Sequence, residues 1–132
     1  MNQKEEEKLV MQYFRESRDD FPQGKLVVSE SPDFMLRINR KKAFGIELTR
    51  LPESPNFVDA LFEIMGKKEQ KINHYRGKGF IEIWLIIYTN DLKKVNSFNL
   101  DNKINNLAFQ SSFSKVFLFD LFERQIYDIQ IH

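Results

Sequence analysis

The apolar run Ile83–Tyr88 is the feature that most constrains the fold of this 132-residue chain. The wider segment Phe80–Tyr88 presents apolar side chains to both faces of an extended strand. Strands buried on both faces are typical of the centre of an α/β sheet. The run is far too short to span a bilayer, which requires about 20 apolar residues. We therefore expect a central strand in a sheet with helices on its faces.

The patterns around this run predict a mixed sheet in an α/β domain. Helical spacing predicts a first helix over about Gln3–Asp20, a second over Pro55–Arg76 with Ser54 as its cap, and a weaker one over Asp101–Gln110. Further strands are expected at Leu26–Val28, Phe34–Ile38, Ala43–Thr49, Val116–Leu121 and Gln125–Ile131. The predicted order is α-β-β-β-α-β-α-β-β, in a single domain spanning residues 1–132.

Composition excludes several kinds of site. The chain has no cysteine, which excludes disulfides, zinc–thiolate sites and a thiol nucleophile. Its two histidines, His74 and His132, have no partner pattern, which disfavours a zinc site or a Ser-His-Asp triad. The glycines are scattered, so a phosphate-binding P-loop is excluded. The charged beginning of the chain is unlike a signal peptide, and we expect a cytoplasmic protein with no membrane partner.

The formal net charge of +1 argues against nucleic-acid binding when composition alone is considered. The charge is unevenly distributed, however. Residues 37–50 carry five basic and one acidic side chain, and residues 67–78 carry the same numbers. Two basic blocks therefore lie in an otherwise acidic chain. They are either solvated faces or surfaces that contact phosphates.

Two carboxylates are predicted to converge on one hairpin. If Asn39–Lys42 forms the turn and Ile38 pairs with Ala43, Asp33 falls opposite Leu48, one position from Glu47. Two adjacent carboxylates are costly to ionise together, and a divalent cation removes that cost. Mg²⁺ binds one or two carboxylates while keeping water and phosphate ligands. The alternative is a polar strand end with two unrelated acids.

The residues of this hairpin resemble a known nuclease motif. Pro32-Asp33, followed across the turn by Glu47-x-Thr49, is similar to the motif of the PD-(D/E)xK nuclease superfamily of restriction-endonuclease-like proteins. The resemblance covers about residues 4–120 and implies an αβββαβ core, here with extra C-terminal strands. It implies that Asp33, Glu47 and the main-chain carbonyl of Leu48 bind Mg²⁺ or Mn²⁺. Thr49 stands where that family has a lysine, and threonine supplies no positive charge.

The second helix contains a lysine that could take over this role. Lys68 lies within the apolar stripe of that helix, between Met65 and Ile72. A charge directed into the protein needs a partner, and Lys68 could meet Asp33 and Glu47. The spacing of Lys68, Lys71 and Tyr75 looks compatible with relatives in which active-site residues have moved onto this helix. The alternative is a lysine that extends past the helix edge into solvent.

Two further acids are candidates for the metal's surroundings. Glu6 falls on the inward face predicted for the first helix, although an acid near a helix N-terminus also simply favours the helix dipole. Glu30 lies just before the motif, with an undefined side-chain direction.

The function expected from these residues is metal-dependent hydrolysis of a phosphodiester, in DNA more than in RNA. Thr49 would assist Lys68. The residues expected to contact flanking phosphates are Arg37, Arg40, Lys41, Lys42, Arg50, Lys71, Arg76 and Lys78. Sequence specificity would need a homodimer, another partner or a structured substrate. Two alternatives stay open: a nuclease-like domain without catalysis that acts as a binding or assembly module, or an α/β interaction domain with incidental carboxylates.

Overall fold

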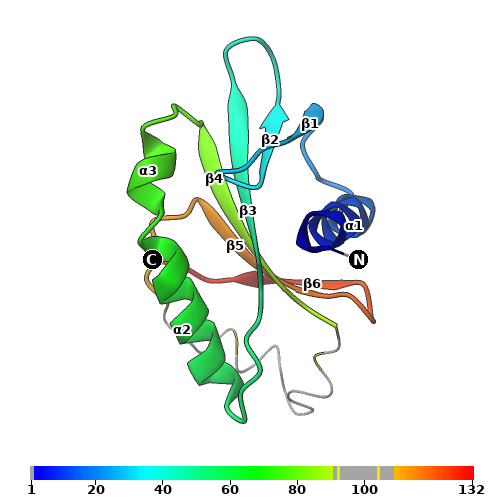
Figure 1. The fold of residues 1–132 in the computed structure, drawn as a ribbon, viewed down its shortest axis with the longest axis vertical. Helices are drawn as coiled ribbons and strands as arrows, with labels where there is room; N and C mark the ends of the chain where they lie inside the picture. Colours follow the sequence, from blue (N-terminus) through cyan, green and yellow to red (C-terminus); the bar gives the residue numbers. More distant parts are fainter. Residues whose placement is uncertain (1, 91, 93–103, 105–108) are drawn as a thin grey trace.

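The computed structural model describes residues 2–90, 92, 104 and 109–132, which form a six-stranded mixed sheet with helices on both faces (Figure 1). The helices are α1 (Gln3–Glu16), α2 (Phe57–Glu69) and α3 (Ile72–Arg76). The strands are β1 (Lys25–Val28), β2 (Phe34–Arg37), β3 (Ala43–Arg50), β4 (Glu82–Thr89), β5 (Lys115–Asp120) and β6 (Gln125–Ile129). The expected mixed α/β architecture is confirmed. No helix of the described ranges is long and apolar enough to cross a membrane.

The strands lie in the sheet in the order in which they occur along the chain. β2 lies between β1 and β3 and runs antiparallel to both. β4 runs parallel to β3, β5 runs parallel to β4, and β6 returns antiparallel to β5. The carboxyl ends of β3, β4 and β5 therefore share one edge of the molecule. As expected, the apolar run forms a central strand, β4, with paired neighbours on both sides.

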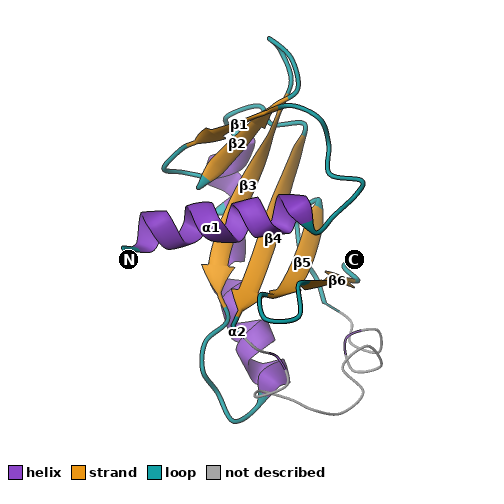
Figure 2. Cartoon of the chain, turned by 90° about the vertical axis from the view of Figure 1, so that its right-hand side faces the viewer, coloured by secondary structure: helices purple, strands orange, loops and turns teal. Residues whose placement is uncertain are grey.

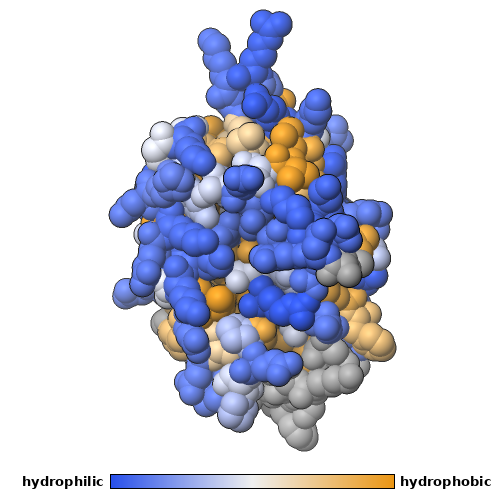
Figure 3. Space-filling view, viewed as in Figure 1, coloured by the Kyte–Doolittle hydropathy of each residue, from blue (hydrophilic) through white to orange (hydrophobic). Residues whose placement is uncertain are grey.

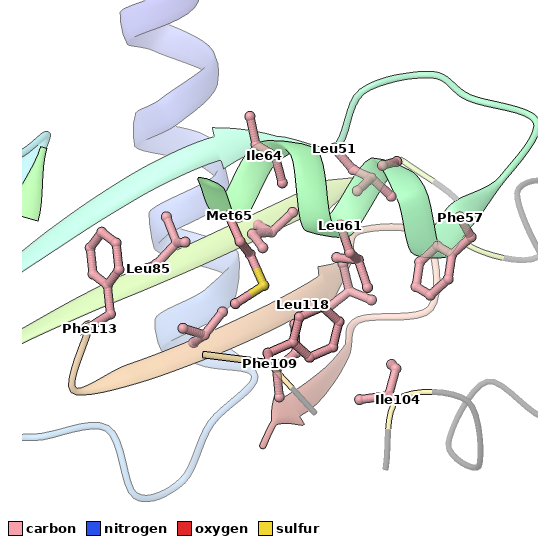
Figure 4. Packing of buried hydrophobic residues seen from close by; sticks show 14 of the residues in the cluster. Leu51, Phe57, Leu61, Ile64, Met65, Leu85, Ile104, Phe109, Phe113 and Leu118 are labelled. Atoms are coloured by element: carbon pink, nitrogen blue, oxygen red, sulfur yellow. The ribbon is translucent and has the colours of Figure 1, made fainter. Parts of the chain in front are cut away.

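Alternating side chains of the sheet build two separate cores. On one face α1 buries Val10, Met11 and Phe14 against β2–β5. On the other face α2 buries Leu61 and Met65 against side chains of β4, β5 and β6 (Figure 4). Figure 2 shows the result as three layers, with α1 crossing one face of the sheet and α2 lying behind it.

The predicted second helix is divided in two. α2 ends at Glu69, and α3 begins three residues later at Ile72. Between them the Lys71 N–H donates to the carbonyl of Lys68, three residues back, as in the tighter turn of a 3₁₀-helix. The cap of α2 is also different from the one expected: the Asn56 side chain, not Ser54, accepts the first free N–H groups.

The predicted hairpin register is wrong by one residue. Arg37, not Ile38, pairs with Ala43, and the Ile38 N–H donates to the carbonyl of Lys42, the next position of the same register. The Asn39 side chain stabilises the turn by accepting two of its N–H groups. If this register is continued, Asp33 falls opposite Glu47.

The remaining differences are smaller. α1 ends at Glu16, four residues before the predicted end, and Ser17 caps it. The predicted helix over residues 101–110 lies almost wholly outside the described residues, which include Ile104, Phe109 and Gln110 from that stretch. The two C-terminal strands are present, as expected.

Candidate metal and phosphate site at the edge of strand β3

The candidate site lies where β3 extends beyond its neighbour β2. The β2 ladder stops at the pair Phe34–Ile46, whereas β3 continues to Arg50 along β4. On the open side, the Leu48 N–H donates to the Asp33 carboxylate over 2.8 Å. Because the N–H and C=O of one strand residue point to the same side, the Leu48 carbonyl also points towards this edge. The edge therefore presents a main-chain oxygen beside a carboxylate.

A glycine on β3 allows Asp33 to reach this position. A Cβ atom at Gly45 would lie 3.0 Å from Phe80 Cδ2 and 3.1 Å from Pro32 Cγ. The missing side chain thus leaves space for Pro32 and Phe80 against the sheet. The Ser29 N–H also donates to the Asp33 carbonyl over 2.8 Å and so closes the loop before β2.

Glu47 is buried, with 3% of its surface exposed, and faces the helices α2 and α3. Its Oε2 atom lies 2.9 Å from the Lys68 ammonium nitrogen and 3.6 Å from that of Lys71. Glu47 also hydrogen-bonds to the hydroxyl of Tyr75, which in turn contacts Ser31. Burial and the nearby Glu47 charge raise the pKa of Tyr75, so this hydroxyl remains protonated. The expected contact of Lys68 with Glu47 is present, whereas the described residues show no hydrogen bond or ion pair between Lys68 and Asp33.

Asp33 has the most perturbed carboxyl group of the site. Burial, then the charge of Glu47, raise its pKa to about 7, and the negative charge of Glu7 adds to the effect. The hydrogen bond from the Leu48 N–H acts in the opposite direction. Asp33 and Glu47 are therefore electrostatically interacting neighbours, and the charge of Glu47 opposes loss of the Asp33 proton. A bound cation would offset the charge of both carboxylates.

Two further residues lie near Asp33 and Glu47 (the acid pair) but are not among the site residues predicted from the sequence. Glu7 is only 5% exposed, and Tyr75 is 1% exposed. Glu7 forms an i, i+3, i+4, i+7 pattern with Val10, Met11 and Phe14, which are the buried residues of α1. That spacing could have identified Glu7. The predicted inward face is instead centred on a neighbouring stripe that contains Glu6.

Glu6 and Glu30 are not placed together with the acid pair. The Glu6 carboxylate accepts hydrogen bonds from the Arg50 guanidinium and, over 3.0 Å, from the Tyr88 hydroxyl. Burial and Glu6 raise the pKa of Tyr88 to about 12. Glu30 is exposed in the connection between β1 and β2, and within the described residues it makes no hydrogen bond or ion pair with Asp33 or Glu47.

A pocket of about 460 Å³ opens at this edge of the sheet. Its walls come from the start of α1, from the end of β3 and from residues of α2 and β4. The lining includes Glu6, Glu7, Leu48, Thr49, Arg50, Lys68 and Tyr88. The pocket thus brings Thr49 and Lys68 beside the Leu48 main chain, together with two carboxylates of α1.

The predicted phosphate-binding residues are divided between the two ends of β3. Arg37, Arg40, Lys41 and Lys42 are exposed around the β2–β3 turn. Lys42 lies five positions before Glu47 along the chain, a distance of about 16 Å. Figure 3 shows hydrophilic side chains projecting at the end of the molecule where Figure 1 places this turn.

The other predicted phosphate contacts lie closer to the acid pair or beside it. Lys71 contacts Glu47, Arg50 lines the pocket, and the Lys78 ammonium donates to the Ser31 carbonyl. Arg76 is exposed at the end of α3.

The edge of β3 offers a donor set for a hard cation. Within residues 2–90, 92, 104 and 109–132, no group of three or more His, Cys, Asp or Glu side chains is arranged to hold a metal. The donors here are instead two carboxylates and the Leu48 carbonyl, the oxygen ligands that Mg²⁺ accepts while keeping several waters. No protein-family model, curated protein or solved structure matches this chain significantly, so its interpretation rests on this geometry.

Proposed function

We propose that this protein is a divalent-metal-dependent phosphodiesterase with a restriction-endonuclease-like core, acting on DNA in preference to RNA. One observation carries the proposal: Lys68, from a helix, lies 2.9 Å from Glu47, and the neighbouring Leu48 N–H donates to Asp33 over 2.8 Å at an open strand edge. The observed order of α1, three antiparallel strands, α2–α3 and a parallel strand supports such a core. The Pro32-Asp33 and Glu47-x-Thr49 motifs occupy this edge.

Asp33, Glu47 and the Leu48 carbonyl would hold Mg²⁺ or Mn²⁺. When bound, the metal supplies Lewis-acid stabilisation of negative charge on a phosphate. The structural support is the proximity of the two acids: burial and the charge of Glu47 raise the pKa of Asp33 to about 7, so ionising both carboxylates is costly. A dication would lower that cost.

Lys68 would supply the positive charge that Thr49 cannot supply. Its ammonium group is anchored by Glu47 with only 17% of the side chain exposed, so it is preorganised beside the Leu48 edge. A fixed ammonium group at this place stabilises the negative charge that develops on the phosphate in the transition state. Thr49 lines the same pocket and can donate a hydrogen bond from its hydroxyl to water or phosphate. Tyr75 holds Glu47 in place.

Isosteric variants test the proposal. We expect Asp33→Asn and Glu47→Gln to lose Mn²⁺ binding in calorimetry and to lose cleavage of plasmid DNA. We expect Lys68→Gln to keep metal binding but to cleave about 10²- to 10³-fold more slowly, the usual cost of removing one transition-state contact. Lys67→Gln is the matched control, because Lys67 is the exposed neighbour of Lys68. Wild-type protein that binds no Mn²⁺ at millimolar concentration contradicts the proposal.

A second candidate is a nuclease-like binding module without catalysis. The observation that favours it is the charge balance of Glu47, which already has two ammonium partners at 2.9 and 3.6 Å. A carboxylate neutralised in this way has less to gain from a cation. Nucleic-acid binding that is unchanged by metal, with no cleavage by the wild type, would favour this candidate.

A further inference from the structure

We propose that Arg50, held by Glu6 and Tyr88, forms a second phosphate subsite that takes a sugar–phosphate unit beside the acid pair and reads no base. This inference rests on the proposed function and specifies its substrate contact. Arg50 and Leu48 are two positions apart on β3, so both lie on the same side of the strand, about 7 Å apart along it. Both line the pocket that also contains Lys68.

The guanidinium of Arg50 is held in place from two directions. Glu6, on α1, accepts a hydrogen bond from one terminal nitrogen of Arg50. The Tyr88 hydroxyl donates to the other oxygen of Glu6 over 3.0 Å, and the guanidinium carbon lies 5.8 Å from the centre of the Tyr88 ring. A guanidinium has five N–H donors in a planar fork. Glu6 accepts from one terminal nitrogen, and because the Arg50 side chain is 53% exposed, further donors of the fork are accessible to phosphate.

The accessibility of the three residues fits this arrangement. The Arg50 side chain is 53% exposed and that of Glu6 is 31% exposed, whereas Tyr88 as a whole is 4% exposed. Arg50 is thus the member that a ligand can reach, and the other two are positioning residues. A preorganised guanidinium loses less conformational freedom on binding than a free arginine does.

The pocket lining also indicates which part of a nucleic acid would enter. Its apolar members, Leu48 and Tyr88, are 3% and 4% exposed, so neither offers a free surface on which a base could stack. The charged members balance: Glu6 and Glu7 face Arg50 and Lys68. A lining of this kind attracts a metal–phosphate pair more than it attracts a bare anion. Contacts to phosphate and sugar carry no sequence information, so binding should be independent of base.

The experiment measures binding of a fluorescent 12-nucleotide single strand by anisotropy, in Ca²⁺, over a range of salt, with gels to verify that the strand stays intact. We expect Arg50→Gln to weaken binding about tenfold and to reduce the salt slope by about 0.7, the loss of one phosphate contact to a single strand. Arg50→Lys should recover most of the slope but not the full affinity, because it restores the charge without the fork. Arg15→Gln, on the exposed face of α1, is the control and should change neither quantity.

A double-mutant cycle tests the positioning residues. Tyr88→Phe keeps the ring and removes the hydrogen bond to Glu6, so we expect a two- to threefold loss of affinity. In the Arg50→Gln background, Tyr88→Phe should cause no further loss of affinity. A purely structural defect caused by Tyr88→Phe would weaken binding in that background too. Oligo-dT and oligo-dA should bind wild type within about threefold of each other.

The outcomes distinguish failure of the proposed function from failure of the Arg50 subsite alone. Wild-type protein that binds no oligonucleotide in Ca²⁺ or Mn²⁺ overturns both the proposed function and the subsite. If Lys68→Gln weakens binding while Arg50→Gln behaves like Arg15→Gln, only the subsite is overturned. A loss confined to one homopolymer overturns the base-independent recognition.

Discussion

At the scale of single residues, Asp33 connects the stability of the fold to pH and to the proposed metal binding. Burial, and then the Glu47 charge, raise the pKa of its carboxyl group from the ordinary 3.8 to about 7 in the folded protein. The folded state therefore holds a proton between these pH values that the unfolded state has released. Stability consequently falls as the pH rises from about 4 to 7. The unprotonated pair, with its two repelling charges, is the state that a cation relieves.

Asp33→Asn should therefore stabilise the metal-free protein, and should do so more at pH 8 than at pH 5. The amide oxygen can still accept the Leu48 N–H, while the repulsion with Glu47 is gone. After allowance for solvent screening we expect the difference in stabilisation between the two pH values to be about 1 to 2 kcal/mol, or about 3 to 6 °C in Tm. Thermal unfolding in a chelator measures it. Asp19→Asn, at an exposed site, is the control, and a gain that is equal at both pH values contradicts the assignment.

The residue-level chemistry was predictable where it followed helical periodicity. The position of Lys68 on the apolar stripe indicated a charge directed inward, and its ammonium group does contact Glu47. Tyr75 belongs to the spacing noted with Lys68 and Lys71, whereas Glu7 shares the periodicity of the buried residues of α1 but belongs to no motif. The contacts of Glu6 with Arg50 and Tyr88 join residues up to 82 positions apart, which no local pattern predicts.

At the scale of elements, the existence of the hairpin was predictable and its register was not. Alternating apolar residues indicated the two strands. The register depends on how many residues the turn takes. Here Ile38 bonds to Lys42 across three residues instead of pairing with Ala43 across four, and the Asn39 side chain accepts the N–H groups of Lys41 and Lys42. The division between α2 and α3 was not predictable either. The stripe of apolar residues continues across Gln70 and Lys71, even though the helix does not.

Gly45→Ala tests how the hairpin positions Asp33. The added Cβ would be 3.0 Å from Phe80 and 3.1 Å from Pro32, so these side chains must move away from β3. We expect a destabilisation of about 1 to 3 kcal/mol, typical of overpacking, together with weaker Mn²⁺ binding. Gly66→Ala is a matched control in α2: no atom lies within 4 Å of the new Cβ. That change should instead stabilise the protein by about 0.5 to 1 kcal/mol, with metal binding unaffected. Equal metal affinities for both variants would show that Gly45 has no positioning role.

At the scale of the whole molecule, one sheet separates two cores. Ile46 belongs to the core under α1, whereas Ile64 belongs to the core between α2 and the sheet. The mixed sheet with helices on its faces was predictable from the apolar run, because a strand without a polar face needs cover on both sides. The distribution of charge over the folded surface was less predictable: the basic residues of the β2–β3 turn end up about 16 Å along the strand from Glu47.

Ile46→Val and Ile64→Val should each destabilise the protein by about 0.5 to 1.5 kcal/mol, as expected for loss of one buried methyl group. Because the sheet lies between the two side chains, the double variant should equal the sum within about 0.5 kcal/mol. Urea unfolding at equilibrium measures all three. A substantially larger or smaller effect in the double variant would show that the two cores are coupled through the strands.

The position of Lys68 has a consequence for how the protein would lose activity on heating. A lysine at position 49 would share a strand with Glu47, and two residues of backbone would set their separation. Here the separation depends instead on how firmly α2 is seated through Leu61, Ile64 and Met65. Partial undocking of α2 would then move Lys68 away from Glu47 while the sheet stays folded. The proposed activity would be lost at a lower temperature than the fold, and that temperature would depend on side chains remote from any substrate.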